Sequence, residues 1–358
     1  MAAKRPRARW IPAIAAAGCA VLTVTSCSSG TGSGAGAAGQ SPAPASALTA
    51  SAACTAGTKE GTLNFVSRTD PDVFAKEAAV FEQAHPGIKV KYTSATPNDE
   101  TQQLITEAQA RHALSADAVT TDLASAQPLF DQGMISNVDY KQLGIPTNLL
   151  LTYNGVNTFR VFRDLLGIGY NTKLVPKSDL PTTWDQLINS KWSGKVIADP
   201  RGTYLGVLAD VWGESKTMTW FNQFKSTDKP VVVQGTTDSI TKVISGEALL
   251  TTSATASAII QQQKSGAPIA IAYLDVVSSQ DKYGVILKGA KHPNAAACFL
   301  SWLGSAEGQA QQLKYEFKSN DDLPSVVPAG ATTAFVTDPA KQAAVTSTTT
   351  QISKLLTQ

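Results

Sequence analysis

The segment from Thr62 to Gln132 alternates between short apolar runs and amphipathic stretches, and this alternation constrains the fold more than any other feature. Three runs have the length and residue types of strands: 62–66, 88–92 and 118–122. The stretch after the first run places Phe74, Ala78 and Phe81 at helical spacing. A β-α-β-α-β order predicts a largely parallel sheet with helices on both faces.

A second α/β segment, residues 167–206, ends in a loop at a position where ligands bind. Thr183 is expected to cap a helix that runs through Ile188, and residues 196–198 form a short apolar strand. The next residues, 199–203, follow the C-terminal end of that strand. In open α/β sheets this end of the strands is where ligands sit.

The composition indicates a globular protein that does not bind nucleic acid. A length of 358 residues allows two domains, and 43% hydrophobic with 16% charged residues is ordinary for a globular chain. The formal net charge is +2, but four of the cations precede residue 10. The remaining chain has 26 basic and 28 acidic residues, so no basic surface for nucleic acid is expected.

The first 57 residues have the composition of an export signal followed by a tether. Residues 1–26 combine four cations with an apolar run too short for a typical membrane span, and they resemble a lipoprotein signal peptide. Cys27 is the expected lipidation site, with Cys19 as a rival that leaves a shorter apolar run. Residues 27–57 are rich in Ser, Gly, Ala, Thr and Pro, which predicts a flexible linker.

Two cysteines remain once Cys19 and Cys27 are assigned to the signal and the lipid. An exported protein with two further cysteines, Cys54 and Cys298, is expected to form one disulfide between them. Two independent thiols are the alternative.

Several short sequence motifs occur in a characteristic order along the chain, and together they point to one family. They are Tyr170-Asn171-Thr172, Leu180-Pro181, Thr183-Trp184, Lys191-Trp192, Gly194-Lys195, Asp199-Pro200-Arg201-Gly202, Gly246-Glu247-Ala248, Gly266-Ala267-Pro268 and His292-Pro293-Asn294-Ala295-Ala296. Their joint order and spacing resembles the family 1 extracellular solute-binding proteins, and more narrowly the ferric-iron-type branch that serves ABC importers. The resemblance covers residues 61–328.

The resemblance implies an α/β fold of the periplasmic-binding-protein type, class II, with a ligand cleft between two lobes. Each lobe is expected to be a mostly parallel sheet flanked by helices. The chain would cross to the second lobe within 158–170 and return at 268–273. The expected parts are lobe 1 at 58–162, lobe 2 at 163–273, lobe 1 again at 274–340, and a loose C-terminal tail at 341–358.

Signatures of catalysis or of cofactor binding are lacking in the sequence. The three histidines are far apart, and the sequence contains neither a Cys-x-x-Cys motif nor a glycine-rich phosphate loop. Ser-x-x-Lys occurs three times without the partner motifs of a serine acylase. We therefore expect no enzyme, no cofactor and no metal site.

The expected ligand-binding residues follow strand ends or begin helices, where free N–H groups and helix dipoles favour anions. They are Ser67, Arg68, Thr69, Thr121, Asp122, Arg201, Gly202, Thr203, Tyr204, Thr236, Thr237, Thr252, Ser253 and Tyr273. Each has a structural alternative: Ser and Thr at these positions also serve as plain helix caps. Asp199 and Arg201 could form a salt bridge within their own loop, and Trp184 and Trp192 are expected in the core.

The ligand class remains open at this point. Ferric-binding members of the family use a vicinal tyrosine pair shortly after the Gly-Glu-Ala word, and no tyrosine follows Gly246–Ala248 here. Hydroxyl groups with Arg68 and Arg201 suit a phosphonate, a phosphate ester or a carboxylate. Iron held by Tyr204 and Tyr273 with a bound anion is one alternative; a polyamine, a thiamine-like cation or a sugar is another.

The resemblance implies a monomeric receptor that passes a small solute to a membrane permease with a cytoplasmic ATPase. It would be anchored through its N-terminal lipid at the outer face of the cytoplasmic membrane, or on the periplasmic side where a second membrane is present. An exported sensor or enzyme on the same fold is the alternative function.

Overall fold

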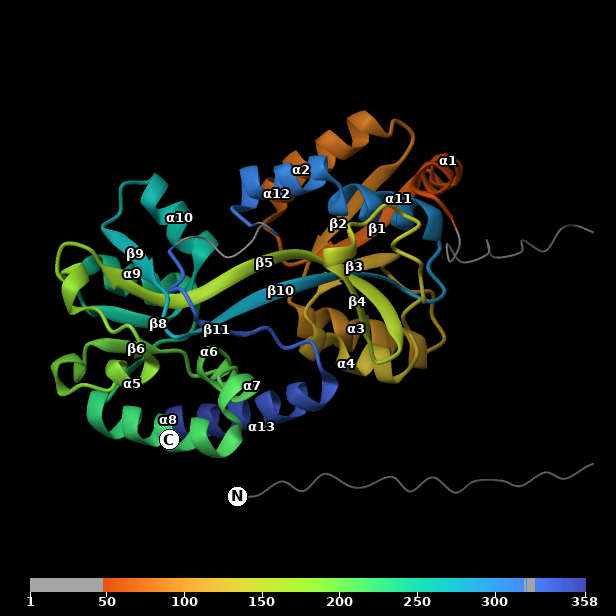
Figure 1. The fold of residues 1–358 in the computed structure, drawn as a ribbon. Helices are drawn as coiled ribbons and strands as arrows, with labels where there is room; N and C mark the ends of the chain where they lie inside the picture. The colour runs from red at the N-terminus through yellow and green to blue at the C-terminus, as the bar shows by residue number, and fades with distance from the viewer. Residues whose placement is uncertain (1–47, 319, 321–325) are drawn as a thin grey trace, which may run out of the picture. The chain divides into compact units, whose positions relative to one another are not determined.

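Two long antiparallel strands, β5 (Val156–Asn171) and β10 (Val276–Ile286), run side by side through the middle of the sheet (Figure 1). The structure is a computed structural model that describes residues 48–318, 320 and 326–358. Within these residues the strands join in one eleven-stranded sheet, in the order β2-β1-β3-β10-β5-β8-β6-β7, with β4, β9 and β11 paired to β5 or β10. The crossover strands therefore link two smaller, largely parallel sheets.

Strands and helices alternate from β1 to α4, as the patterning of residues 62–132 predicts. The other strands are β1 (Thr62–Ser67), β2 (Lys89–Ser94), β3 (Ala118–Thr121), β4 (Leu150–Tyr153), β6 (Val196–Ala198), β7 (Val231–Val232), β8 (Leu250–Thr255), β9 (Ile269–Ala272) and β11 (Thr332–Ala334). The α-helices are α1 (Ala50–Glu60), α2 (Pro71–Ala84), α3 (Pro97–Gln109), α4 (Leu123–Asp131), α5 (Trp184–Leu187), α6 (Thr203–Gly206), α7 (Ala209–Trp212), α8 (Glu214–Asp228), α9 (Thr236–Ser245), α10 (Ala256–Lys264), α11 (Pro293–Gly304), α12 (Ala306–Glu316) and α13 (Pro339–Leu356). Short 3₁₀ turns cover Thr147–Leu149, Lys177–Asp179 and Ser190–Trp192. The helices that the structure describes include no segment with the length and hydropathy of a membrane span.

We call the half built on β1, β2 and β3 lobe 1. These strands are parallel, and β10 closes their sheet in the antiparallel direction against β3. Neighbouring residues of β1 point to opposite faces, as the two-residue period of a strand requires. Phe65 packs with α2 and α11 through residues such as Phe81 and Phe299, whereas Val66 packs with Leu104 and Phe130 of α3 and α4. Both faces of the lobe 1 sheet are therefore covered by helices.

We call the half built on β6, β7 and β8 lobe 2. These strands are also parallel, and β8 pairs with β5. Val196 and Ala198 join the cluster that contains Trp184 and Trp220, while Ile197 faces a second cluster under α9 and α10. Trp184 and Trp192 are both core residues, as predicted.

A helix lies within each of the two regions expected to be a flexible linker and a loose tail. Helix α1 begins at Ala50, inside the region 27–57 expected to be flexible, and its small residues pack on α11. Helix α13 occupies the region expected to be a loose tail. It is capped by Asp338, and it buries Val345, Ile352 and Leu356 in the lobe 2 core. The Thr-rich composition hid this apolar stripe.

The return crossover also differs from the prediction. Strand β9, within the expected crossover 268–273, pairs only with β5 among the described strands. The chain returns through β10, so Leu274 and Val276 still belong to the lobe 2 core rather than to the second part of lobe 1. Apolar runs predict strands without indicating which strand bridges two lobes.

Candidate functional site

A cavity of about 600 Å³ lies where lobe 1, lobe 2, β10 and α13 meet. Lobe 1 lines it with Arg68 and the first residues of α3 and α4, and lobe 2 with Arg201, Thr203 and Tyr204. Strand β10 contributes residues 279–283, and α13 contributes five side chains between 342 and 350. The size and the mixture of polar and apolar walls are typical of small-molecule sites.

Two helices of lobe 1 begin at this cavity. Thr96 caps α3, and Asp122 caps α4 by accepting a hydrogen bond from the N–H of Ser125 at 2.8 Å. The Nζ of Lys282 lies 2.9 Å from Oδ2 of Asp122. Burial by itself raises the pKa of Asp122, but the charge of Lys282 and these hydrogen bonds outweigh it and hold the pKa below its ordinary value. Asp122 is therefore ionised, and its carboxylate is bonded to Lys282 and to the N–H of Ser125.

The lobe 2 wall is built around an internal ion pair. Arg201 forms two hydrogen bonds with the carboxylate of Asp199, at 2.9 and 2.6 Å, and Asp199 also accepts from the N–H of Gly235. Burial tends to raise the pKa of Asp199, yet its bonds with Arg201 lower it overall. This is the loop salt bridge that the sequence left as an alternative. It satisfies part of the guanidinium of Arg201 inside the protein.

Tyr204 brings a phenol to the cavity from the start of α6. Its hydroxyl lies 2.6 Å from Oγ1 of Thr236 and accepts from Nε2 of Gln280 at 3.2 Å. The ring itself is buried. Thr236 therefore supports the site through Tyr204 and does not line the cavity.

A bidentate ion pair joins the two crossover strands next to the cavity. Nε of Arg163 lies 3.0 Å from Oδ1 of Asp281, and its Nη2 lies 2.7 Å from Oδ2. Such a pair fixes the register of β5 against β10. Asp281 lines the cavity with its charge already balanced.

Arg68 differs from the other charged residues of the lining. It is exposed, at the end of β1, and no acidic side chain of the described residues lies within ion-pair distance of it. Lys282 and Arg201 each pair with an acidic side chain, and Asp281 pairs with Arg163. In the described part of the chain, Arg68 is thus the cation of the lining that is available to an anion.

The structure brings five of the fourteen predicted ligand-binding residues together at the cavity: Arg68, Asp122, Arg201, Thr203 and Tyr204. The other nine do not line it: Ser67, Thr69, Gly202, Thr121, Thr236, Thr237, Thr252, Ser253 and Tyr273. Most of these nine are buried and bonded within the protein. Thr69, for example, donates to Glu316, and Thr252 donates to the carbonyl of Ile197. A hydroxyl group at a strand end can form a hydrogen bond with a neighbouring element as readily as with a ligand.

Three parts of the lining were missed in the sequence. Residues 279–283 were not among the expected ligand-binding residues, and neither were Thr96, Pro97 and Asn98 at the start of α3. Helix α13 was taken for a tail, although Asp338-Pro339 is a typical helix start. This Asp-Pro pair and the spacing of the apolar residues Val345, Ile352 and Leu356 were the signals that could have revealed helix α13.

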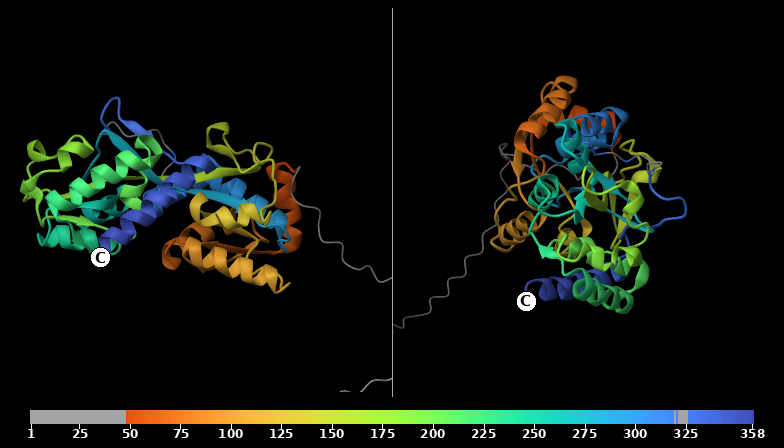
Figure 2. Two further views of the ribbon diagram at one scale, coloured as in Figure 1. Left: turned by 90° about the horizontal axis from the view of Figure 1, so that it is seen from below. Right: turned by 90° about the vertical axis from the view of Figure 1, so that its left-hand side faces the viewer.

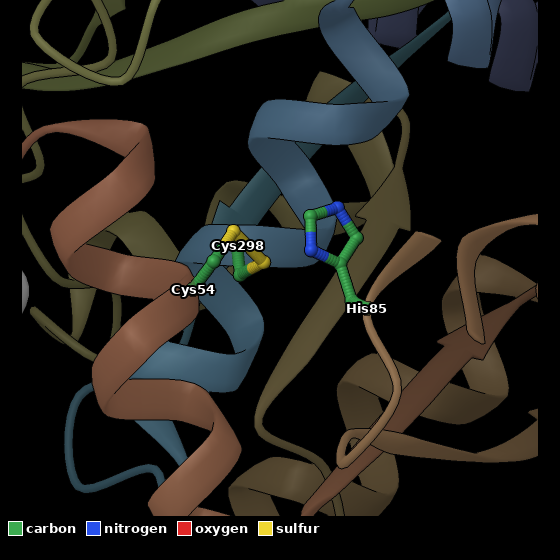
Figure 3. A group of neighbouring side chains, drawn as sticks. All are labelled: Cys54, His85 and Cys298. Atoms are coloured by element: carbon green, nitrogen blue, oxygen red, sulfur yellow. A yellow bond between two sulfur atoms is a disulfide. The ribbon is translucent and has the colours of Figure 1, made fainter. Parts of the chain in front are cut away.

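Away from the cavity, Cys54, His85 and Cys298 bring their ligand atoms within 4.8 Å of one another (Figure 3). The two sulfurs are bonded as a disulfide between α1 and α11. Neither cysteine then has a thiolate to offer a metal, so this cluster is a covalent tie within lobe 1. The predicted lipidation site Cys27 lies outside the described residues.

The model of the bacterial extracellular solute-binding proteins matches residues 76–341 of this chain. The chain belongs to this family. An uncharacterized protein of Haemophilus influenzae is 27% identical over 173 residues, which cover 46% of this chain and 48% of that protein. The match thus spans about half the length of that relative.

Solved structures show that this solute-binding protein has the two-lobe periplasmic-binding-protein fold. Iron-bound HitA from Pseudomonas aeruginosa superposes with a TM-score of 0.68 at 18% identity, covering 83% of this chain and 99% of HitA. AfuA from Actinobacillus pleuropneumoniae, solved with fructose-6-phosphate, gives a TM-score of 0.63 at 17% identity, covering 82% and 97%. The predicted fold class and family are confirmed. At these identities the likeness concerns the fold and leaves the ligand open.

Proposed function

We propose that this solute-binding protein captures a small organic anion and delivers it to the permease of an ABC importer. The observation that supports this function is the cavity lined by both lobes and by the crossover strands between them. A ligand in that position contacts both lobes at once. It therefore favours the arrangement in which the lobes are close together, which a receptor needs to signal that it is loaded.

Charge and size support an organic anion such as a phosphonate, a phosphate ester or a carboxylate. A guanidinium like that of Arg68 pairs bidentately with these groups. The volume of about 600 Å³ suits a molecule of many atoms better than a single ion. The iron alternative needs Tyr204 and Tyr273 in one site, yet Tyr273 packs against Leu165 and Val277 and does not line the cavity.

A thermal-shift screen of the full-length protein tests this proposal, with phosphonates, sugar phosphates, carboxylates, polyamines, thiamine and ferric citrate. A ligand at a hundredfold excess over its Kd stabilises the folded state by about 2.7 kcal/mol, a Tm shift of several degrees. We expect an anion to give this shift, and Arg68→Gln to reduce it strongly.

Lys76→Gln is the matched control, because Lys76 is an exposed cation of lobe 1 that does not line the cavity. It should leave the shift unchanged. A shift with ferric citrate or a polyamine alone would contradict the anion proposal, and so would a shift that Arg68→Gln leaves intact.

We also propose that the protein is anchored by lipid on Cys27, as the signal-like N-terminus predicts. Lipid chains on the first residue of the mature chain would hold it at the outer face of the membrane. We expect Cys27→Ala to move the protein from the membrane fraction to the soluble fraction, with Cys19→Ala as the control. Release by Cys19→Ala alone would assign the lipid to Cys19.

A further inference from the structure

Helix α13 supplies a wall of the cavity that lies beyond the family match, which ends at residue 341. Four polar side chains of this helix line the cavity at positions 342, 346, 349 and 350. Their spacing places them on one face of the helix. We call Gln342, Thr346, Thr349 and Thr350 the polar stripe of α13.

Helix α13 is also held rigidly by the rest of the protein. Val345, Ile352 and Leu356 anchor α13 in the lobe 2 core, and α13 lies alongside α8 (Figure 2). Two glycines of the α6 region let its backbone approach closely. A Cβ on Gly202 would lie 2.6 Å from the carbonyl oxygen of Thr349, and one on Gly206 would lie 2.7 Å from its Cα. The polar stripe is therefore fixed in place before any ligand arrives.

The hydrogen-bonding capacity of the stripe is only partly used within the helix. The hydroxyl of Thr350 donates to the carbonyl of Thr346 at 2.9 Å, which leaves its oxygen lone pairs as acceptors. The hydroxyl of Thr346 accepts from Nε2 of Gln342 at 3.3 Å, which leaves its own proton to donate. Adjacent turns thus offer one donor and one acceptor to the cavity without any charge.

We propose that the polar stripe of α13 determines specificity by binding the hydroxyl groups of a hydroxylated organic anion. This inference rests on the proposed function, in which Arg68 across the cavity receives the anionic group. A ligand hydroxyl both donates and accepts, as the stripe requires, whereas an alkyl group would leave the hydroxyl proton of Thr346 and the oxygen lone pairs of Thr350 without a ligand partner. The ligand class is therefore a sugar phosphate, a sugar acid or a polyol phosphate.

Calorimetric titration of the full-length protein tests this with two pairs of probes that share an anionic group. The pairs are glycerol 3-phosphate with propyl phosphate, and gluconate with hexanoate. We expect the wild type to prefer the hydroxylated member of at least one pair. Thr346→Val with Thr350→Val should weaken that member about tenfold or more and change its partner less than twofold.

Two further variants separate recognition from folding. Thr346→Ser keeps the hydroxyl and should retain most of the affinity, while Ser347→Ala removes an exposed hydroxyl outside the lining and should change nothing. Equal weakening of both members of a pair, or no weakening, overturns the role of the stripe. If Arg68→Gln abolishes binding while the valine variants bind normally, only this inference fails. If the wild type binds none of the four probes, this inference fails, and the proposed function stands or falls with the thermal-shift screen.

Discussion

At the scale of single residues, the cavity is surrounded by charges that the protein has largely balanced itself. Lys282 pairs with Asp122, Arg201 with Asp199, and Arg163 with Asp281. Such partly buried pairs contribute little net stability, because desolvation offsets their attraction. They hold loops and strands in position around the cavity, and among the lining residues that the structure describes they leave Arg68 as the cation open to a solute.

Glu100, in the first turn of α3, is a buried carboxyl near the same charges. Both its oxygens are buried and lack a hydrogen-bond partner among the described residues. Burial raises its pKa to about 9, more than the nearby charge of Lys282 lowers it. The folded protein therefore keeps a proton at neutral pH that the unfolded chain releases. The contribution of Glu100 to stability is fully present below pH 4.5 and is lost as the pH rises toward 9.

We therefore expect Glu100→Gln, which cannot titrate, to raise the Tm at pH 8 by several degrees and to change it little at pH 5. Differential scanning calorimetry across this pH range measures both values. Glu247→Gln is the control: Glu247 is exposed, and its bond with Lys242 lowers its pKa, so no gain at pH 8 should follow. A gain from Glu100→Gln that is the same at both pH values would show that titration is not the cause.

At the scale of elements, helix α13 contributes five residues to the cavity lining. It closes one side of the site, and Val345, Ile352 and Leu356 on the adjoining face complete the lobe 2 core, Val345 also lining the cavity. A helix held by so few large side chains should depend strongly on each of them.

Ile352→Ala should destabilise the protein by about 2–5 kcal/mol, because it deletes a fully buried side chain and leaves a cavity. Urea unfolding measures the loss, and limited proteolysis should show earlier cleavage near the C-terminus. Lys354→Ala, on the exposed side of the same helix, should have little effect. An unchanged unfolding midpoint for Ile352→Ala would mean that residues 341–358 are a loose tail after all.

At the scale of the whole molecule, the disulfide joins two positions 244 residues apart in sequence. It ties α1, at the beginning of the described chain, to α11 after the return from lobe 2. Closing so long a loop restricts the unfolded chain strongly, which is the main way a disulfide stabilises a protein.

Reduction of the folded protein should therefore lower its stability by about 2–5 kcal/mol. Thermal unfolding with and without dithiothreitol measures the difference. Cys54→Ala provides the control, since it should show the lowered Tm and no further response to the reductant. A wild-type Tm that dithiothreitol does not change would contradict a stabilising role for this bond.

Local patterning was sufficient for the parallel β-α-β order of lobe 1 and for the strand of residues 196–198, because strand and helix periods are properties of neighbouring residues. The family words added the two-lobe arrangement. Five of the predicted residues reached the cavity because they follow the C-terminal ends of β1, β3 and β6, where parallel strands present their loops.

What local patterning could not supply depends on contacts between distant residues. Lys282 and Asp122 are 160 positions apart, so nothing near either residue indicates that their charges cancel. Thr69, Thr252 and Tyr273 have the same local appearance as a ligand residue, yet neighbouring elements bury or bond them. Helix α13 became a wall of the site only by docking on Gly202 and Gly206, since its own sequence is polar and its apolar stripe is sparse. Tertiary packing determined which polar groups were used within the protein and which remained for a ligand.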